Sequence, residues 1–376
     1  MKYDYLIVGA GFTGSVLAER ISSVLNKTVL IIDKRNHIGG NCYDYKDENG
    51  ILIHKYGPHI FHTVNRKVWD YLSKFTDWHS YSHEVLAVID DKKVPIPFNL
   101  NSIEMCFPKN KADLMKSLLI EKYGHEAKIP ILKLIESSNE HLKELADFIY
   151  QKVFLGYTVK QWGLKPEELD MSVTSRIPVF ISRDNRYFQD TYQGIPVNGY
   201  TEVFKKMLAN KNIKVRLDTN HKDVSADDYR KMIFTGPIDS FFEYKYGQLP
   251  YRSLNFEFET YESDFYQEKA QVNYPNNFDF TRITEFKHFL NYEGINHTTV
   301  AREYSELYTV GENEPYYPIP NPENHKMYDK YKQEAEKIKE NVLFVGRLAD
   351  YKYYNMDQVV GVALQFFDKK IMKTDF

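Results

Sequence analysis

The chain has 376 residues and a nearly balanced charge, with 49 Lys and Arg against 52 Asp and Glu and a formal net charge of −3. This length allows two or three domains with buried cores, and the absence of a basic excess argues against a nucleic-acid-binding protein. No apolar run approaches ~18 residues, so we expect no membrane insertion and no signal peptide. The two cysteines, Cys42 and Cys106, cannot form a disulfide framework, and they favour a cytoplasmic protein.

The first 33 residues carry the pattern of a dinucleotide-binding βαβ unit. An apolar strand runs into Gly9-x-Gly11-x-x-Gly14, and a second apolar strand ends at Asp33, 19 residues after the third glycine. Gly9 permits a tight turn, Gly11 lets the backbone approach a pyrophosphate, and Gly14 lets the helix pack close to the sheet. The helix N-terminus offers N–H groups to phosphates, and Asp33 can accept hydrogen bonds from a ribose diol.

The middle of the chain changes from strand-like to helical patterns. Residues 85–97 predict a β-hairpin with its turn at 90–93. Apolar residues at helical spacing predict helices over 111–122 and 142–153. The segment 161–195 is irregular and rich in Trp, Arg and Tyr.

An α/β pattern then resumes and gives way to strands before the C-terminal part. The predicted elements, in order, are a helix at 202–208, strands at 214–217 and 232–235, strands at 254–259, 270–274, 281–286 and 297–304, a helix near 324–339, a strand at 342–345 and a helix over 356–370.

Two further glycine motifs favour a flavin over a nicotinamide cofactor. Gly39-Gly40 follows Asp33 closely and lets that loop fold back over a buried FAD. Gly346-Arg347 ends the last predicted strand, where the glycine admits the cofactor and the arginine can neutralise its pyrophosphate. The dinucleotide predicted from these residues is therefore FAD.

With these motifs in place, the whole chain resembles the UDP-galactopyranose mutase family. The matching stretches, in family order, are Gly39-Gly40-Asn41, Tyr56-Gly57-Pro58-His59-Ile60-Phe61-His62-Thr63, Gly156-Tyr157-Thr158-Val159-Lys160-Gln161-Trp162-Gly163, Ser175-Arg176-Ile177-Pro178-Val179, Tyr192-Gln193-Gly194-Ile195-Pro196, Tyr251-Arg252-Ser253-Leu254, Thr281-Arg282, Glu314-Pro315-Tyr316-Tyr317-Pro318, and Gly346-Arg347-Leu348 through Tyr353 to Met356-Asp357.

The resemblance implies an isomerase of bacterial surface-glycan biosynthesis that interconverts UDP-galactopyranose and UDP-galactofuranose. In the family, N5 of reduced FAD is thought to attack the anomeric carbon and displace UDP, with no net redox change. It also implies an external reductant such as NAD(P)H and a homodimer. No metal is expected.

The resemblance further assigns roles to individual residues. Arg176 and Arg282 would grip the diphosphate, and His59 would position the flavin. The substrate-binding residues would be Tyr157, Thr158, Trp162, Tyr187, Arg252, Tyr317, Tyr353, His83 and Asn355, the last two standing where many relatives have Asn and Asp. The cofactor-binding residues would be Gly9, Gly11, Phe12, Gly14, Asp33, Gly40, Asn41, His59, Ile60, Gly346, Arg347, Met356 and Asp357.

The expected fold is α/β, with a Rossmann-like FAD-binding domain, a helical insertion domain and an antiparallel β-sheet domain. The FAD-binding domain is expected to comprise 1–84, 195–245 and 321–376, and the insertion 98–160. The sheet and substrate domain is expected to comprise 85–97, 161–194 and 246–320, with a mobile segment at 161–190 that closes over UDP.

Three alternatives remain open at this point. Some relatives act on UDP-N-acetylgalactosamine, although His59 in the Gly-Pro loop favours plain galactose. The first 45 residues alone also fit an amine-oxidase-like flavoenzyme. A non-enzymatic regulator that binds a flavin or a nucleotide sugar is the third.

Overall fold

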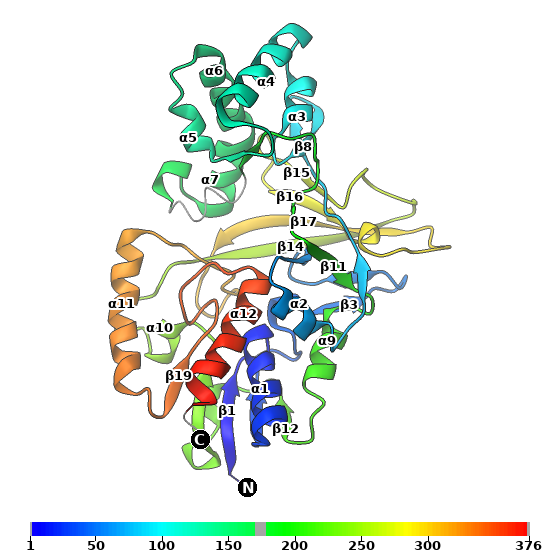
Figure 1. Cartoon of the computed structure of the whole chain (residues 1–376). Coiled ribbons are helices and arrows are strands. Elements are labelled where there is room, and N and C mark those ends of the chain that lie inside the picture. The colour runs from blue at the N-terminus through cyan, green and yellow to red at the C-terminus, as the bar shows by residue number, and fades with distance from the viewer. Residues whose placement is uncertain (1, 170–177, 374–376) are drawn as a thin grey trace. The chain divides into compact units, whose positions relative to one another are not determined.

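The computed structural model describes residues 2–169 and 178–373. The chain folds into two compact units (Figure 1). Each unit has its own hydrophobic core. Unit 1 comprises Met1–Ser80, Asp190–Tyr251 and Tyr308–Phe376, and unit 2 comprises Tyr81–Gln189 and Arg252–Leu307. The predicted helical insertion lies in unit 2 together with much of the predicted sheet domain, whereas residues 308–320 lie in unit 1. The three-domain division stays a prediction.

Unit 1 is built on a five-stranded parallel sheet in the order β12-β2-β1-β13-β19. The strands are β1 (Tyr3–Val8), β2 (Val29–Ile32), β12 (Ile213–Arg216), β13 (Tyr229–Phe234) and β19 (Val342–Phe344). β2 is buried along its whole length. Such continuous apolar runs are typical of parallel strands that are covered on both faces. The predicted α/β fold with a Rossmann-like unit is confirmed.

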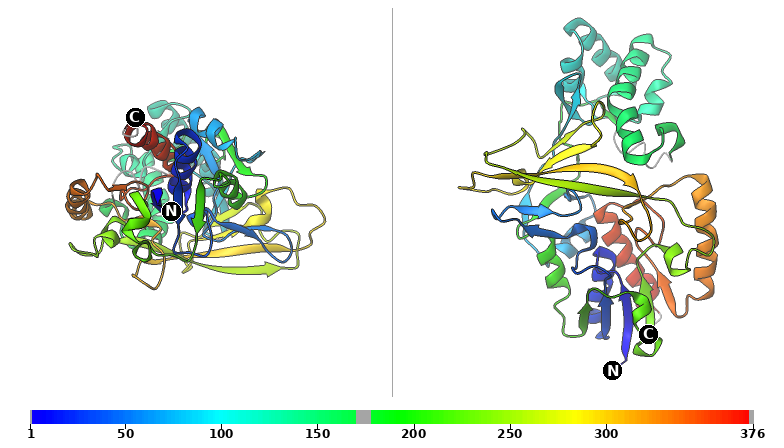
Figure 2. Two further views of the ribbon diagram at one scale, coloured as in Figure 1. Left: turned by 90° about the horizontal axis from the view of Figure 1, so that it is seen from below. Right: turned by 180° about the vertical axis from the view of Figure 1, so that it is seen from behind.

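Two helices from opposite ends of the sequence pack together in unit 1. α1 (Phe12–Leu25) contacts α12 (Met356–Phe366), and Figure 2 shows the two lying side by side. The side chain and backbone of Asn355 form a capping box with Gln358 at the start of α12. α12 continues into a π-helical segment over Phe367–Ile371, so the helix predicted over 356–370 is confirmed.

The other elements of unit 1 are short. They are the 3₁₀ helix Gly40–Cys42, β3 (Asp44–Lys46), β4 (Leu52–His54), β5 (Phe61–Thr63), α2 (Arg66–Leu72), β6 (Trp78–Ser80), β11 (Tyr192–Pro196), α9 (Tyr200–Met207), the 3₁₀ helices His221–Asp223 and Ala226–Asp228, α10 (Ile238–Phe241), β18 (Tyr317–Pro318) and α11 (Pro322–Lys337).

β11 lies at the end of a stretch that the sequence predicts to be irregular. It is the middle strand of a small antiparallel sheet between β5 and β6. Its sequence, Tyr-Gln-Gly-Ile-Pro, contains the residues of a turn and no alternation. Pairing with strands more than 100 residues away in the sequence, rather than local preference, therefore makes it a strand.

Unit 2 has a helical part that packs with strands β7 (Val85–Ile89) and β8 (Lys92–Ile96) around one apolar core. Its elements are α3 (Leu100–Cys106), α4 (Lys109–Tyr123), β9 (Lys128–Ile129), α5 (Ile131–Ile135), α6 (Glu140–Ile149), a π-helical segment over Tyr150–Leu155, α7 (Gly156–Trp162), a 3₁₀ helix over Pro166–Glu168 and β10 (Val179–Phe180). The helix predicted at 111–122 is confirmed as α4. The helix predicted at 142–153 is longer, because α6, the π-helical segment and α7 follow one another without a break.

The second part of unit 2 is a sheet, and the strands that this unit contributes to it follow the order β14-β17-β16-β15-β7-β8. These are β7 (Val85–Ile89), β8 (Lys92–Ile96), β14 (Tyr251–Tyr261), β15 (Gln271–Asn273), β16 (Arg282–Glu285) and β17 (Thr298–Leu307). The predicted hairpin is confirmed as β7–β8, with positive φ at Asp90 and Asp91 in the turn. The sheet is mainly antiparallel, as predicted, but β7 and β15 pair in parallel, since they belong to segments joined through the rest of the fold and not by a hairpin.

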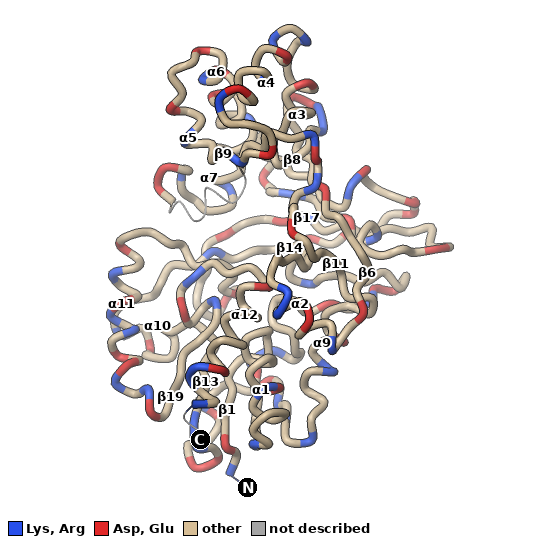
Figure 3. Tube along the Cα trace, in the orientation of Figure 1, with Lys and Arg blue, Asp and Glu red and all other residues tan. Residues whose placement is uncertain are grey.

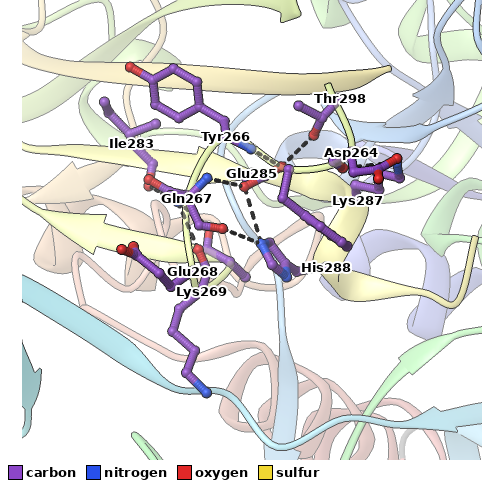
Figure 4. Close-up of polar contacts among 12 residues, drawn as sticks. Asp264, Tyr266, Gln267, Glu268, Lys269, Ile283, Glu285, Lys287, His288 and Thr298 are labelled. Carbon is purple, nitrogen blue, oxygen red and sulfur yellow. Dashed lines mark hydrogen bonds and ion pairs between the residues drawn. The ribbon is translucent and has the colours of Figure 1, made fainter. Parts of the chain in front are cut away.

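A buried polar cluster fixes the end of β16 in unit 2 (Figure 4). Glu285 is fully buried, and its carboxylate accepts hydrogen bonds from the backbone N–H groups of Tyr266 and Gln267 and from the hydroxyl of Thr298. His288 Nε2 lies 3.1 Å from the same carboxylate and 3.0 Å from the carbonyl of Gln267. Because both neighbours are acceptors, Nε2 carries the proton. The cluster ties the 264–270 loop to the strand that begins at Arg282.

Charges of both signs are interspersed along the two units (Figure 3). Within the part of the chain that the structure describes, no helix combines the length and the apolar character needed to cross a membrane.

Candidate cofactor and substrate site

A cavity of about 530 Å³ opens in unit 1 at the carboxyl ends of β1, β2 and β13. Its volume lies in the range of small-molecule and cofactor sites. The cavity is lined there by Val8 at the end of β1, by Gly9 after it, by Asp33 after β2 and by Thr235 after β13. Ligands of open parallel sheets bind at this edge, outside the carboxyl ends of the strands.

The glycine loop brings backbone against the cavity. Gly9 has φ +104°, and a Cβ there would overlap the hydroxyl oxygen of Thr235. Gly11 is the N-cap of α1, and it has no side chain that could accept from the first N–H groups of the helix. A Cβ on Gly14 would overlap the carbonyl oxygen of Gly9. The loop thus presents bare backbone N–H groups and the positive end of a helix dipole to a ligand.

The Asp33 carboxylate is held in place by two backbone donors. Oδ2 accepts from the N–H of Ala10 at 2.8 Å, and Oδ1 accepts from the N–H of Arg35 at 3.0 Å. Asp33 is buried and lines the cavity. Each oxygen keeps a further acceptor site, so the carboxylate can also receive hydrogen bonds from a diol.

The side chain of Arg347 lines the opposite part of the cavity. Gly346 before it has φ +114°, and a Cβ there would lie 2.8 Å from Thr13 Oγ1. The guanidinium donates through Nη2 to the carbonyl of Tyr354 at 2.5 Å and lies 5.7 Å from the ring centroid of Tyr317 and 5.9 Å from that of Tyr353. Its Nε is buried and has no hydrogen-bond partner among the described residues. Such a donor is typical of a site whose acceptor is a ligand.

An ion-paired segment closes another side of the cavity. The Glu314 carboxylate lies 3.1 Å from Lys34 Nζ and 2.9 Å from Arg35 Nη2, and all three residues line the cavity. Burial raises the pKa of Glu314, but the charges of Arg35 and Lys34 lower it more, so the net shift is downward. The guanidinium of Arg35 also lies 4.6 Å from the ring centroid of Tyr56. These contacts connect residues 308–316 to the loop after Asp33.

His59 lines the cavity from a fixed loop. Its Nδ1 lies 2.7 Å from the carbonyl of Gly57 and therefore carries a proton, and its backbone N–H donates to His54 Nδ1 at 3.0 Å. Burial lowers the pKa of His54 well below its ordinary value, which keeps that ring neutral and its Nδ1 an acceptor.

In unit 2, α7 carries three of the predicted substrate residues. Tyr157 and Thr158 lie in its first turn and are half-buried, whereas Trp162 at its end is 7% exposed. The carbonyl of Gln161 accepts from Arg252 Nε at 2.9 Å and from Ser305 Oγ at 2.7 Å. The buried Arg252 is thus placed as a donor to the C-terminal carbonyls of α7.

Arg282 is held by a buried carboxylate. Its Nε and Nη2 both donate to Oε2 of Glu303, at 2.8 and 2.7 Å, and Glu303 is 1% exposed. Thr281 donates to the other oxygen of Glu303 at 3.1 Å. Two charge-assisted hydrogen bonds that converge on one carboxylate oxygen restrict the orientation of the guanidinium.

His83 and Tyr187 lie together at another place in unit 2. The N–H of Tyr187 donates to the carbonyl of His83 at 2.7 Å, and the ring centroids are 5.8 Å apart. The hydroxyl of Tyr81 lies 3.3 Å from His83 Nδ1.

The chain is similar to known proteins over nearly its whole length. The profile of the UDP-galactopyranose mutase family matches residues 152–353, and that of an NAD(P)-binding Rossmann-like domain matches residues 7–75. The chain is 38% identical to a probable UDP-galactopyranose mutase of Klebsiella pneumoniae, over 97% of this chain and 94% of the relative. It is 36% identical to the dTDP-fucopyranose mutase of Escherichia coli, over 96% of each chain.

This chain belongs to the UDP-galactopyranose mutase family. It is thus an enzyme of the mutase class. A crystal structure of reduced UDP-galactopyranose mutase has the same fold, with a TM-score of 0.73 and 16% identity over 99% of this chain and 94% of that one.

Within this mutase the predicted cofactor residues divide into two groups. Those that line the cavity are Gly9, Gly11, Phe12, Asp33, Gly40, Asn41, His59, Arg347 and Met356. Those outside the lining are Gly14, Ile60, Gly346 and Asp357, of which the Asp357 carboxylate accepts from the hydroxyl of Thr63 at 2.9 Å.

The predicted substrate residues of the mutase come from both units. Tyr317, Tyr353 and Asn355 belong to unit 1, where the rings of the two tyrosines meet edge to face at 4.9 Å. Tyr157, Thr158, Trp162, Tyr187, His83, Arg252 and Arg282 belong to unit 2. Arg176 lies outside the described residues. Among those described, no group of His, Cys, Asp and Glu could hold a metal ion.

Several residues of the candidate site are not among those predicted from the sequence. Residues 219–222 and 234–237 line the cavity, as do Tyr308, Val310, Gly311, Glu314, Pro315 and Tyr316. Glu303 holds Arg282. Glu303 stands in a period-two strand pattern that gave no sign of its burial. The one available signal was the apolar strand at 232–235, whose carboxyl end meets the same sheet edge as that of β1.

Proposed function

We propose that this mutase interconverts UDP-galactopyranose and UDP-galactofuranose with reduced FAD in the cavity of unit 1. The observation that carries the proposal is the buried Nε of Arg347, which has no hydrogen-bond partner among the described residues, in a cavity that the glycine loop and Asp33 also line. A pyrophosphate would accept from that Nε, and a ribose diol would donate to Asp33.

The chain's residues fit FAD through their backbone as much as through their side chains. Gly11 and Gly40 approach each other so closely that a Cβ on Gly40 would lie 3.0 Å from the Cα of Gly11. A side chain at either position would fill space beside the helix N-terminus that a pyrophosphate needs. When bound, reduced FAD would supply a nucleophile for the anomeric carbon without net oxidation or reduction.

The positive groups of unit 2 fit the leaving nucleotide. Negative charge grows on UDP as the glycosidic bond breaks, so a fixed cation there stabilises the transition state more than the ground state. We assign this role to Arg282, which Glu303 holds in one orientation, and by resemblance to Arg176. His59 would orient the cofactor rather than donate a proton, because its Nδ1 proton is already directed at a backbone carbonyl.

Aromatic residues fit the remainder of the nucleotide sugar. Tyr157 and Trp162 would pack against the uridine, and Tyr317 and Tyr353 would donate hydrogen bonds to the phosphates. In the same proposal NAD(P)H or a similar donor reduces the flavin, and the enzyme acts as a cytoplasmic homodimer in bacterial surface-glycan biosynthesis.

A related nucleotide sugar is the second candidate substrate. The 36% identity to a dTDP-fucopyranose mutase is close to the 38% identity to the probable UDP-galactopyranose mutase. UDP-N-acetylgalactosamine remains a third candidate from the sequence.

The deciding experiment is a ring-interconversion assay of the dithionite-reduced protein. UDP-galactose, UDP-N-acetylgalactosamine and dTDP-fucose are supplied in parallel, and the furanose products are separated by chromatography. We expect the largest kcat/KM for UDP-galactose, no product from the oxidised protein, and no oxygen consumption with amines. A larger kcat/KM for dTDP-fucose would make the second candidate the function.

The role of Arg282 is tested in the same assay. Arg282→Ala should keep its flavin but lose at least about 100-fold in kcat, a loss typical of removing one group that stabilises transition-state charge. Arg66→Ala is the matched control, because Arg66 is 80% exposed and pairs with Asp70 on the surface of α2. Full turnover by Arg282→Ala would contradict the assignment.

A further inference from the structure

The helical run over 150–162 is docked onto the segment 274–280 of the same unit by the Lys160 side chain. The Nζ of Lys160 donates to the backbone carbonyls of Phe278 at 3.0 Å, Phe280 at 2.9 Å and Tyr274. Lys160 is half-buried. An ammonium group has three N–H donors, so the three carbonyls account for all of them.

Two further contacts join the same two segments. Asn276 Nδ2 donates to the carbonyl of Lys152 at 2.8 Å, one helical stretch before α7. Gly156 faces the segment so closely that a Cβ there would collide with the carbonyl oxygen of Pro275. The segment 274–280 therefore lies in close contact with the helical run at Gly156, and hydrogen bonds join the two at Lys152 and at Lys160.

The segment 274–280 leads directly into Arg282. The N–H of Tyr274 donates to the carbonyl of Thr281 at 2.9 Å, and the N–H of Thr281 donates to the carbonyl of Glu303 at 2.8 Å. Arg282 is then paired with the Glu303 carboxylate. The segment whose carbonyls accept hydrogen bonds from Lys160 is thus the segment that positions the Arg282 guanidinium.

We propose that Lys160 is a positioning residue that sets the place of Arg282 relative to α7, and with it the affinity for the nucleoside diphosphate. Lys160 acts through the carbonyls of 274–280 and does not touch the nucleotide. The inference rests on the proposed function in one respect, that α7 and Arg282 both bind the UDP moiety.

The protonation state of Lys160 gives the proposal a second observable. Burial lowers the pKa of Lys160 to about 8, against the raising effect of the Asp279 carboxylate. The charged groups near it are the Asp279 carboxylate on the segment and Arg252, whose Nη2 donates to the backbone carbonyl of Lys160 at 3.2 Å. A neutral amine has only two N–H donors for three carbonyls, so the contact between α7 and the segment 274–280 should weaken as pH rises through about 8.

The test uses the full-length flavin-bound protein and two variants, Lys160→Met and Lys143→Met. Lys143 is the control because it is an exposed lysine on α6 of the same unit. Amide hydrogen exchange of residues 274–282 is measured without nucleotide, and the Kd for UDP is measured by titration. We expect Lys160→Met to exchange about 10-fold faster in this segment and to bind UDP about 10-fold more weakly, with Lys143→Met unchanged.

A measurement of the UDP affinity of the unmodified protein as a function of pH tests the proposal without any variant. It therefore remains informative if Lys160→Met folds poorly. In the unmodified protein, the UDP affinity should fall between pH 7 and pH 9, with a midpoint near 8. Lys143→Met should show the same fall, and Lys160→Met should lack it.

The proposal is wrong if Lys160→Met leaves both the exchange of 274–282 and the UDP affinity unchanged, or if the unmodified protein shows no loss of UDP affinity through pH 8. Faster exchange without any change in UDP affinity would also overturn it, because Lys160 would then be structural only. Failure of the proposed function is separate, since it would appear as absent UDP binding in the unmodified protein while the exchange difference persists.

Discussion

At the scale of single residues, unit 1 contains a buried carboxylate outside the cavity. Asp239 in α10 is fully buried, and its Oδ2 accepts from the N–H of Leu249 at 2.8 Å. Its Oδ1 is buried and has no hydrogen-bond partner among the described residues. Burial raises the pKa of Asp239 to about 6 from an ordinary value of 3.8. The folded state thus holds this proton more tightly than the unfolded state does.

This residue predicts a pH dependence of stability with a definite sign. Because the folded pKa is the higher one, the free energy of unfolding gains a contribution as pH falls through 6 and loses it as pH rises. With a folded pKa of about 6, the gain between pH 7 and pH 5 is about 1 kcal/mol.

Asp239→Asn provides the comparison, since the amide oxygen can still accept from Leu249 but cannot titrate. Urea denaturation at pH 7 and pH 5 gives the pH-dependent change in the free energy of unfolding of the unmodified protein and of Asp239→Asn. The other titrating groups are common to both proteins, so their contributions cancel when the two changes are subtracted. If the two proteins showed the same pH dependence of the free energy of unfolding, the pKa of Asp239 would not be raised in the folded state, and the prediction would be wrong.

At the scale of elements, the turn between β1 and α1 shows how a local motif and a distant contact combine. The positive φ of Gly9 is local, but the steric limit on its Cβ comes from Thr235, more than 200 residues later. The hydroxyl of Thr235 donates to the carbonyl of Val8 at 2.8 Å and so cannot easily move away. The carboxyl ends of β1 and β13 therefore constrain each other.

Gly9→Ala should remove most of the bound flavin. The alanine would be strained at φ +104° and would overlap Thr235 Oγ1, which forces the phosphate-facing turn to shift. Gly50→Ala is the matched control, because Gly50 also has positive φ, +82°, but no atom of the described part of the chain lies within 4 Å of its Cβ position. Flavin absorbance per protein is the readout, with a loss of more than half expected for Gly9→Ala and none for Gly50→Ala. Full flavin content in Gly9→Ala would exclude the turn from cofactor binding.

At the scale of the whole molecule, the cavity belongs to one of the two units. Its lining comes from all three chain segments of unit 1, and among residues 2–169 and 178–373 the core residues of unit 2 do not line it. A ligand that binds only the folded form stabilises it by about 2.7 kcal/mol at a concentration of 100 times its Kd. Bound flavin should therefore stabilise unit 1 most directly.

Removal of the flavin should raise amide hydrogen exchange in selected parts of unit 1. The expected segments are 219–222, 234–237 and 308–316, which line the cavity without lying in the glycine loop. α4 and α6 in unit 2 serve as internal references and should change little. Uniform deprotection of both units would show that the flavin stabilises the two as one cooperative body.

The Rossmann start, the hairpin β7–β8 and the long helices can be predicted from the amino-acid sequence, because each depends on spacing within about 30 residues. The parallel pairing of β7 with β15 and the contribution of 219–222 and of parts of 308–316 to the cavity arise from contacts in the folded chain. The same holds for the partners of three residues of the predicted motifs. Arg282 pairs with Glu303, Lys160 donates to carbonyls of 274–280, and Arg252 donates to a carbonyl at the end of α7. These contacts join residues far apart in the chain, and local periodicity carries no information about which distant groups meet once the apolar faces are buried.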